Sequence, residues 1–386
     1  MTYALGQGTG PLRGIRVVEV AGIGPGPHAA TILADLGADV VRVDRAKAAF
    51  DVLTFPHDPL SRTRAWIGVD TKAPAGRDVV LRLIDAADVL IEGFRPGVTE
   101  RLGLGPDVCL ERNPRLVYGR ITGWGQDGPL ADAAGHDINY IGLAGALEPI
   151  GRADERPVPP LNLLGDFGGG GMLLAMGVLA ALVERASSGR GQVVDASMVD
   201  GAALLTAGLH GLRNIGLWNK GRGHNMLDGG APFYDTYETA DGRYVAVGAI
   251  EERFWGDLCK VLELDPAEVA GRLDPAQWPA VKEKLADRFR TRTRYEWAAR
   301  AEGTDACLTA VLTPEEAREH PHNVARGTFV DLDGHRQPAP APKFGRTVPD
   351  TPRAPHEPRS DTTGVLLSLG YSAEDIDELR ADGVIA

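Results

Sequence analysis

The sequence predicts an α/β protein whose parallel sheet is followed by a smaller α+β domain. Patterns of buried strands at 14–20, 39–44, 88–92 and 115–121 alternate with helical patterns at 28–36 and 79–86, an order typical of strand-helix-strand units. A β-hairpin pattern with an Ala-Asp-Gly turn then appears at 234–247. At 386 residues the chain is also longer than a single core usually supports, about 250 to 300 residues.

The remaining elements follow in order along the chain. A long apolar helix is expected at 171–186. Past about residue 226 the strand-helix alternation gives way to the β-hairpin pattern, which marks the start of the second domain. Further helices are predicted at 254–262, 278–289 and 294–302. Seven prolines between 338 and 358 then predict an extended linker, and Ser372 is expected to cap the last helix.

Composition excludes several classes of protein. A formal charge of −12 argues against a non-specific nucleic-acid binder. The three cysteines, Cys109, Cys259 and Cys307, are too few and too widely spaced for a disulfide framework or a zinc site. No signal-peptide pattern opens the chain, and the apolar run 172–183 is too short to cross a bilayer. We therefore expect a cytoplasmic protein without a membrane partner.

Two segments carry acid-base chemistry. Residues 135–140 place an imidazole, a carboxylate and a phenol together, and His136 has a side chain suited to taking and returning protons near neutral pH. In 161–171 one carboxylate, Asp166, precedes four glycines that lead into a helix, where freed amides stabilise negative charge. Structural roles remain open for both, a hydrogen-bonded histidine and a helix cap.

Other motifs point to an anionic ligand. The glycine-rich turn 22–27 sits between a strand and a helix, but Pro27 replaces the third glycine of a dinucleotide fingerprint. Basic residues fall in loops expected at the carboxyl ends of the strands, where guanidinium groups pair well with phosphate. They are Arg45, Arg62, Arg64, Lys72, Arg95 and Arg101.

Glu251 lies at the end of a predicted strand of the second domain. Its carboxylate is either a partner for His136 or an exposed charge at a strand end.

Taken together, these segments resemble the α-methylacyl-CoA racemases of the family III CoA-transferase superfamily. The likeness runs through residues 14–27, 93–105, 123–126, 135–140, 165–169 and 228–232. The resemblance implies that His136 and Asp166 are catalytic and that Glu251 is the acidic partner of the histidine. It also implies CoA or substrate contacts at Arg45, Val69, Asp70, Thr71, Lys72, Gly93, Phe94, Arg95, Pro96, Gly97, Arg101, Gly135, Asp137, Ile138, Asn139 and Tyr140.

The resemblance further implies the architecture. It consists of a large Rossmann-like domain, 1–200 completed by 350–386, a linker helix at 201–225, a small domain at 226–333 and a proline-rich return linker at 334–349. Two chains are expected to interlock as a homodimer. The segment 47–60 departs from the family pattern, which leaves one wall of the cleft without a template.

The implied reaction is inversion of the carbon beside the thioester of a 2-methylacyl-CoA. One of His136 and Asp166 removes the proton while the other returns one from the opposite side, with no metal or organic cofactor. The main alternative is a CoA-transferase in which Asp166 is the nucleophile. A third reading, a non-catalytic acyl-CoA-binding module, leaves the acid-base pair without a role.

Overall fold

The computed structural model describes residues 8–20, 22–47 and 57–386. Its contacts divide the chain into two compact units. The large unit comprises Met1–Ala144, Leu161–Leu205 and Arg326–Ala386, and the small unit comprises Gly145–Pro160 and Thr206–Ala325. Both units are therefore built from segments that are separated in the sequence.

The large unit contains a six-stranded parallel sheet with the order β3-β2-β1-β4-β5-β6. Its strands are β1 (Arg16–Val20), β2 (Asp39–Asp44), β3 (Arg64–Gly68), β4 (Val89–Glu92), β5 (Val117–Thr122) and β6 (Val193–Ser197). The direction of strand succession reverses between β1 and β4. In doubly wound sheets ligands bind at the carboxyl ends of the strands at this switch point. The fold class predicted from the sequence is confirmed.

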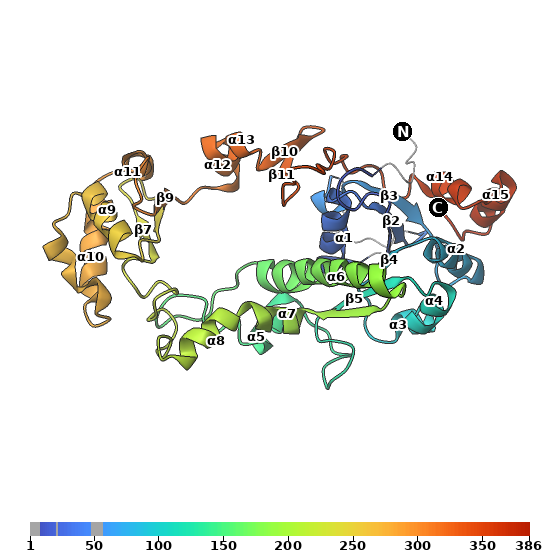
Figure 1. The fold of residues 1–386 in the computed structure, drawn as a ribbon, viewed down its shortest axis with the longest axis horizontal. Helices are drawn as coiled ribbons and strands as arrows, with labels where there is room; N and C mark the ends of the chain where they lie inside the picture. Colours follow the sequence, from blue (N-terminus) through green and yellow to red (C-terminus); the bar gives the residue numbers. More distant parts are fainter. Residues whose placement is uncertain (1–7, 21, 48–56) are drawn as a thin grey trace. The chain divides into compact units, whose positions relative to one another are not determined.

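Helices cover both faces of this sheet (Figure 1). They are α1 (Pro25–Asp35), η1 (Pro59–Ser61), α2 (Pro74–Asp85), α3 (Val98–Arg101), α4 (Pro106–Arg112), α5 (Asp137–Leu143), the π-helix η2 (Leu163–Met172), α6 (Leu173–Ser188), α7 (Met198–Leu205), α14 (Thr362–Ser368) and α15 (Ala373–Ala381). Ser372 caps α15 as predicted, because its hydroxyl accepts from the N–H of Asp375. A hairpin of β10 (Phe329–Leu332) and β11 (His335–Pro338) also belongs to this unit.

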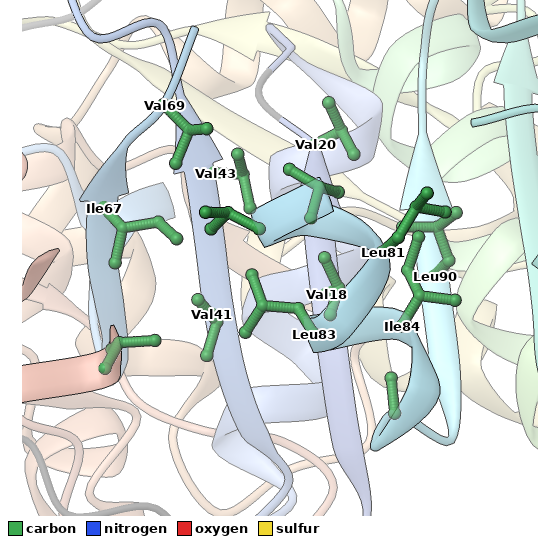
Figure 2. Close-up of a cluster of buried hydrophobic side chains, with 14 of the residues drawn as sticks. Val18, Val20, Val41, Val43, Ile67, Val69, Leu81, Leu83, Ile84 and Leu90 are labelled. Atoms are coloured by element: carbon green, nitrogen blue, oxygen red, sulfur yellow. The ribbon is translucent and has the colours of Figure 1, made fainter. Parts of the chain in front are cut away.

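The hydrophobic core follows the two-residue period of the strands. Val18 and Val41 point to the face covered by α2 and α14, where Ile84 is fully buried (Figure 2). Val17 and Val40 point to the opposite face, beneath α1 and α6. The strands β1, β2, β4 and β5 are buried on both sides, which is why they were recognisable as near-continuous apolar runs.

The helical stretch Leu163–Ser188 has the length and apolar composition of a membrane span, and 39% of its most apolar window is buried. Within it, Leu174 and Val178 are fully buried against the sheet. The stretch is thus a covering helix of the large unit. It is also longer than the predicted 171–186, because a π-helix precedes α6.

The small unit has its own core. Its antiparallel sheet contains β7 (Asp235–Glu238), β8 (Tyr244–Val247) and β9 (Leu308–Ala310), and its helices are α8 (Ala207–Asn214), α9 (Glu252–Leu262), η3 (Pro266–Leu273), α10 (Trp278–Phe289), α11 (Arg294–Ala301), α12 (Pro314–Glu319) and α13 (Pro321–Arg326). Phe233, Trp255, Phe289 and Trp297 fill the space between sheet and helices. The predicted hairpin and the three predicted helices are all present.

The unit boundaries differ from the predicted domains. Residues 145–160 belong to the small unit, where Arg222 donates to the carbonyl of Glu148 at 2.7 Å. Residues 326–333 belong to the large unit, because the β10–β11 hairpin is tied to it by Arg62, which donates to Gln337 at 2.9 Å. The predicted linker helix 201–225 is divided between α7 and α8.

The contact between α7 and the π-helix is close enough to test by mutation. A Cβ on Gly201 would lie 1.9 Å from the carbonyl oxygen of Gly169, so Gly201→Ala must force two backbones apart. We expect a loss of about 1–3 kcal/mol of stability, visible as a lower midpoint of thermal unfolding. The control is Gly208→Ala in α8, where an added Cβ meets nothing within 4 Å. Equal midpoints for the two variants would contradict the packing described.

Candidate active site

A cavity of about 620 Å³ opens at the switch point of the parallel sheet, within the usual range for small-molecule sites, about 300–1,000 Å³. The turn 22–27 after β1 and the segment 93–96 after β4 form two of its walls. Thr122 at the end of β5, with Gly123 and Trp124 after it, forms a third. His136 and Asp166 both line this one cavity, and their catalytic roles stay a prediction.

Asp166 lies in the π-helix, on the turn that faces the cavity. Its Oδ2 accepts from Asn162 Nδ2 at 3.1 Å. Across from it is Gly24, whose φ of 67° favours glycine. A Cβ on Gly24 would lie 3.1 Å from Asp166 Oδ2, so the backbone of the turn approaches the carboxylate closely.

His136 stands at the first position before α5, with an extended backbone (φ −134°, ψ 174°). The backbone N–H of His136 donates to Asn139 Oδ1 at 3.0 Å. The hydroxyl of Tyr140 donates to the carbonyl of Gly135, and Trp124 packs edge-on against the Tyr140 ring with centroids 4.8 Å apart. The backbone that carries the imidazole is therefore fixed from both sides.

The electrostatics join the two groups. Burial raises the pKa of Asp166 above the ordinary aspartate value, and the nearby charge of Asp137 adds to this, while Asn162 and His136 act in the opposite direction. Burial also raises the pKa of Tyr140, and the Asp166 charge contributes to that shift. A carboxyl group with a raised pKa holds a proton closer to neutral pH, which suits general acid-base work.

Asp137 has a different place from the one implied by the resemblance. It does not line the cavity, and its Oδ2 accepts from the N–H groups of Gly165 and Asp166 at 2.6 and 2.7 Å. The carboxylate thereby caps the start of the π-helix that carries Asp166. Its Oδ1 is buried without a hydrogen-bond partner in the described structure.

Replacing Asp137 is expected to separate capping from charge. Asp137→Ala leaves the N–H groups of Gly165 and Asp166 without an acceptor, at a cost of about 1–3 kcal/mol for each buried group. Asp137→Asn keeps an oxygen acceptor but removes the negative charge, so it should unfold later than the alanine variant and lower the pKa of Asp166. Denaturant unfolding and ¹³C titration of the aspartate carboxyls measure the two effects. Equal stability of both variants would contradict the capping role.

The predicted CoA contacts divide into two groups. Those that line the cavity are Gly93, Phe94, Arg95, Pro96, Gly135 and Tyr140. Those outside its walls are Arg45, Val69, Asp70, Thr71, Lys72, Gly97, Arg101, Asp137, Ile138 and Asn139. Arg45 and 69–72 nevertheless follow β2 and β3 directly, so they lie at the same edge of the sheet as the cavity.

Three further predictions have mixed outcomes. The phosphate-binding interpretation of Arg62 and Arg64 is wrong, because both are buried in ion pairs, Arg62 with Asp35 at 2.5 Å and Arg64 with Glu19. Glu251 lies in the small unit, immediately before α9, and its role stays a prediction. Of the divergent segment 47–60, residues 48–56 lie outside the described residues, and Asp58 and Leu60 line the cavity.

Sequence reasoning missed Arg42, Asp58 and Trp124 as cavity residues. Trp124 closely follows the apolar strand β5, so its place beyond the carboxyl end of a parallel strand was the available signal. Arg42 lies within β2 and offered no such signal. Among the described residues, no group of three or more histidine, cysteine, aspartate or glutamate side chains is placed to hold a metal ion.

Comparisons with known proteins agree over nearly the whole chain. A sequence model of CoA-transferase family III matches residues 12–361. Proteins named alpha-methylacyl-CoA racemase from Mus musculus and Homo sapiens are 48% and 46% identical, each covering 97% of this chain and 97% of the relative. The solved structure of a CAIB/BAIF family protein from Brucella suis matches with a TM-score of 0.81 at 25% identity, covering 94% of this chain and 100% of that chain.

Proposed function

The chain belongs to CoA-transferase family III, and from that premise we propose that it is an isomerase that inverts the α-carbon of 2-methylacyl-CoA thioesters. The names of the relatives from mouse and human support this substrate class. The observation that carries the proposal is the placement of His136 and Asp166 on one cavity at the switch point of the sheet. Two proton-handling groups on one cavity are what inversion of a C–H centre requires.

In the proposed reaction, the α-proton leaves to one of the two groups and the thioester becomes a planar enolate. The other group then delivers a proton to the opposite face, and the roles exchange with the hand of the substrate. Burial raises the pKa of Asp166, which makes its carboxylate a better base than that of an ordinary aspartate and supports its use as a proton-transfer group.

Stabilisation of the enolate oxygen needs hydrogen-bond donors, and removing one such donor typically costs about 10² to 10³ in rate. The amides of Gly165 and Asp166 at the glycine-rich helix start already donate to Asp137. We therefore assign the donor role to the first turn of α5, next to His136, where the backbone N–H of Asp137 lies.

Several finer assignments belong to the same proposal. Glu251 orients His136. The residues named above as CoA contacts bind the CoA moiety of the substrate. The reaction uses no metal or organic cofactor, since acid-base chemistry alone moves the proton. We place the enzyme in the cytoplasm, in keeping with three free cysteines, of which Cys307 is exposed.

We also propose that two copies form the homodimer implied by the resemblance. Large apolar side chains are exposed in the large unit on α5, the π-helix and α6. They are Ile138, Leu143, Leu163, Met172, Met176 and Val183. Both α5 and α6 contact the π-helix, so these side chains lie on neighbouring helices. Exposed apolar surface typically marks an interaction site, and a second copy covering these helices accounts for it. Sedimentation equilibrium at several concentrations tests for the dimer.

Transfer of CoA between acids is the alternative reaction, with Asp166 attacking the thioester as a nucleophile. Its carboxylate does face the cavity, but transfer has no need for His136 as a second proton-handling group. One experiment separates the two reactions: a single enantiomer of 2-methylacyl-CoA is incubated in deuterated water without an acceptor acid. Inversion predicts deuterium at the α-carbon and loss of optical purity. Strict dependence on an added carboxylate would establish transfer instead.

A further inference from the structure

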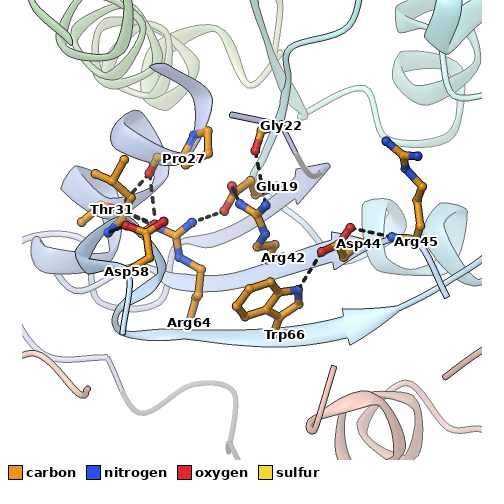
Figure 3. A network of polar contacts seen from close by, with 11 residues as sticks. Glu19, Gly22, Pro27, Thr31, Arg42, Asp44, Arg45, Asp58, Arg64 and Trp66 are labelled. Carbon is orange, nitrogen blue, oxygen red and sulfur yellow. Dashed lines mark hydrogen bonds and ion pairs between the residues drawn. The ribbon is translucent and has the colours of Figure 1, made fainter. Parts of the chain in front are cut away.

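A group of buried ion-paired side chains lies beneath the turn 22–27 (Figure 3). Arg42 Nη1 donates to Glu19 Oε1 at 2.7 Å, and Arg64 donates to Glu19 Oε2. The side chains are exposed by 7% for Arg42, 1% for Glu19 and 0% for Arg64. We call these three residues, which come from β2, β1 and β3, the Glu19 cluster.

The Glu19 cluster holds both ends of the turn. Arg42 Nη2 donates to the carbonyl of Gly22 at 3.3 Å, and Arg64 Nη2 donates to the carbonyl of Pro27 at 3.2 Å. The hydroxyl of Thr31 donates to the same Pro27 carbonyl at 2.8 Å and accepts from Arg64 Nη2 at 2.6 Å. In each guanidinium, therefore, Nη1 donates to Glu19 and Nη2 donates to a carbonyl of the turn.

The other side of the turn faces Asp166. An added Cβ on Gly24 would lie 3.1 Å from Asp166 Oδ2, and one on Gly170 of the π-helix would lie 3.0 Å from Pro25 Cβ. The turn is thus in direct contact with the helix that carries the carboxylate. Any displacement of the turn changes the space around Asp166 and its access to water.

Stability alone does not account for the Glu19 cluster. Burying one carboxylate and two guanidinium groups removes strong hydration, and well-packed apolar residues often replace such groups without loss of stability. What apolar side chains cannot do is donate to the carbonyls of Gly22 and Pro27. The planar, forked guanidinium suits this double task, which the single ammonium of lysine does not reproduce.

We propose that the Glu19 cluster positions the turn 22–27 against Asp166, and so sets both the placement and the desolvation of that carboxyl group. Arg42, Arg64 and Glu19 are positioning residues that act through the turn. The proposal rests on the proposed function, in which Asp166 handles the substrate proton.

Arg42→Lys tests the proposal, with Arg185→Lys as the matched control. Arg185 is equally buried, with 8% of its side chain exposed, and pairs with Asp88 at 2.8 Å, but it contacts the amino-terminal ends of β4 and β5. In Arg42→Lys we expect kcat for α-proton exchange to fall by about tenfold to a hundredfold, with KM little changed. The acidic limb of the pH profile should move to lower pH, because a looser turn admits water to Asp166 and lowers its pKa. The control should keep the kcat and the pH profile of the parent enzyme.

A second pair of variants covers the case in which Arg42→Lys does not fold. Thr31→Val keeps the shape of the side chain but removes the hydroxyl that donates to Pro27, while Thr31→Ser restores it. We expect the kcat loss and the lower pH limb in the valine variant, and recovery of both in the serine variant. Identical behaviour of valine and serine variants, or of Arg42→Lys and Arg185→Lys, would overturn the positioning role.

A direct titration separates this inference from the proposed function. The pKa of Asp166 is followed through its ¹³C carboxyl signal, assigned with Asp166→Asn, in the parent enzyme and in Arg42→Lys. A lower pKa in Arg42→Lys supports the positioning role even if the parent enzyme exchanges no α-proton, in which case the proposed function alone fails. An unchanged pKa in a variant that still exchanges the proton counts against the positioning role alone.

Discussion

Asp166→Asn is expected to slow racemisation by about 10² to 10⁴, the usual effect of removing one general acid-base group. Exchange of the α-proton should persist for one enantiomer only, the one whose proton faces His136. That enantiomer gains deuterium without changing hand, because no group remains on the opposite side to complete the inversion. Mass spectrometry of the recovered thioester, combined with chiral chromatography, measures both quantities.

Stability gives an independent readout of the same variant. Because the pKa of Asp166 is raised in the folded protein, ionisation of this group destabilises the fold relative to the unfolded chain at any pH above both values. The neutral asparagine removes that cost, so Asp166→Asn should unfold no earlier than the parent enzyme at neutral pH. The matched control is Asp195→Asn. Burial also raises the pKa of Asp195, but this residue does not line the cavity, and its replacement should leave racemisation intact.

His136→Gln should give the mirror image of this result. The amide keeps polar atoms near the position of the ring but cannot exchange a proton near neutral pH, so a rate loss of about 10² to 10⁴ is again expected. Deuterium should now enter only the enantiomer whose proton faces Asp166. His210→Gln, on the exposed surface of α8, is the control for a histidine remote from chemistry.

The two variants are most informative together. Opposite stereochemical preferences place His136 and Asp166 on opposite faces of the α-carbon. If both variants exchanged the same enantiomer, or if either retained full racemisation, the two-group mechanism would be wrong.

Much of the fold was predictable because the central strands β1, β2, β4 and β5 are buried on both faces and read as continuous apolar runs. The strand β3 was missed because it opens with Arg64, whose charge is compensated by Glu19 from a distant strand. The edge strand β6 was missed because it is only partly buried and carries Asp195. Both omissions come from tertiary context, which a local pattern does not contain.

The candidate site was predictable to the extent that it depends on residue chemistry. His136 and Asp166 stood out by their side chains and their glycine-rich surroundings, and the resemblance strengthened both assignments. The π-helix around Asp166 was not predictable, since four successive glycines disfavour helix. Close packing against α7, at the contact of Gly169 with Gly201, accompanies its helical form. Arg42 was missed because a buried charge on a strand has no recognisable spacing.

Residues 326–386 complete the large unit beside β3. The N–H of Asp70, just after β3, donates to the carbonyl of Val384 at 2.8 Å. During synthesis on the ribosome, the small-unit segment 206–325 therefore emerges before residues 326–386, which complete the large unit. Domains generally fold as units while the chain is made. A nascent chain that has reached only residue 325 therefore still lacks the groups that pair with the edge of β3, among them Asp361, which accepts from the N–H of Trp66 at 2.8 Å.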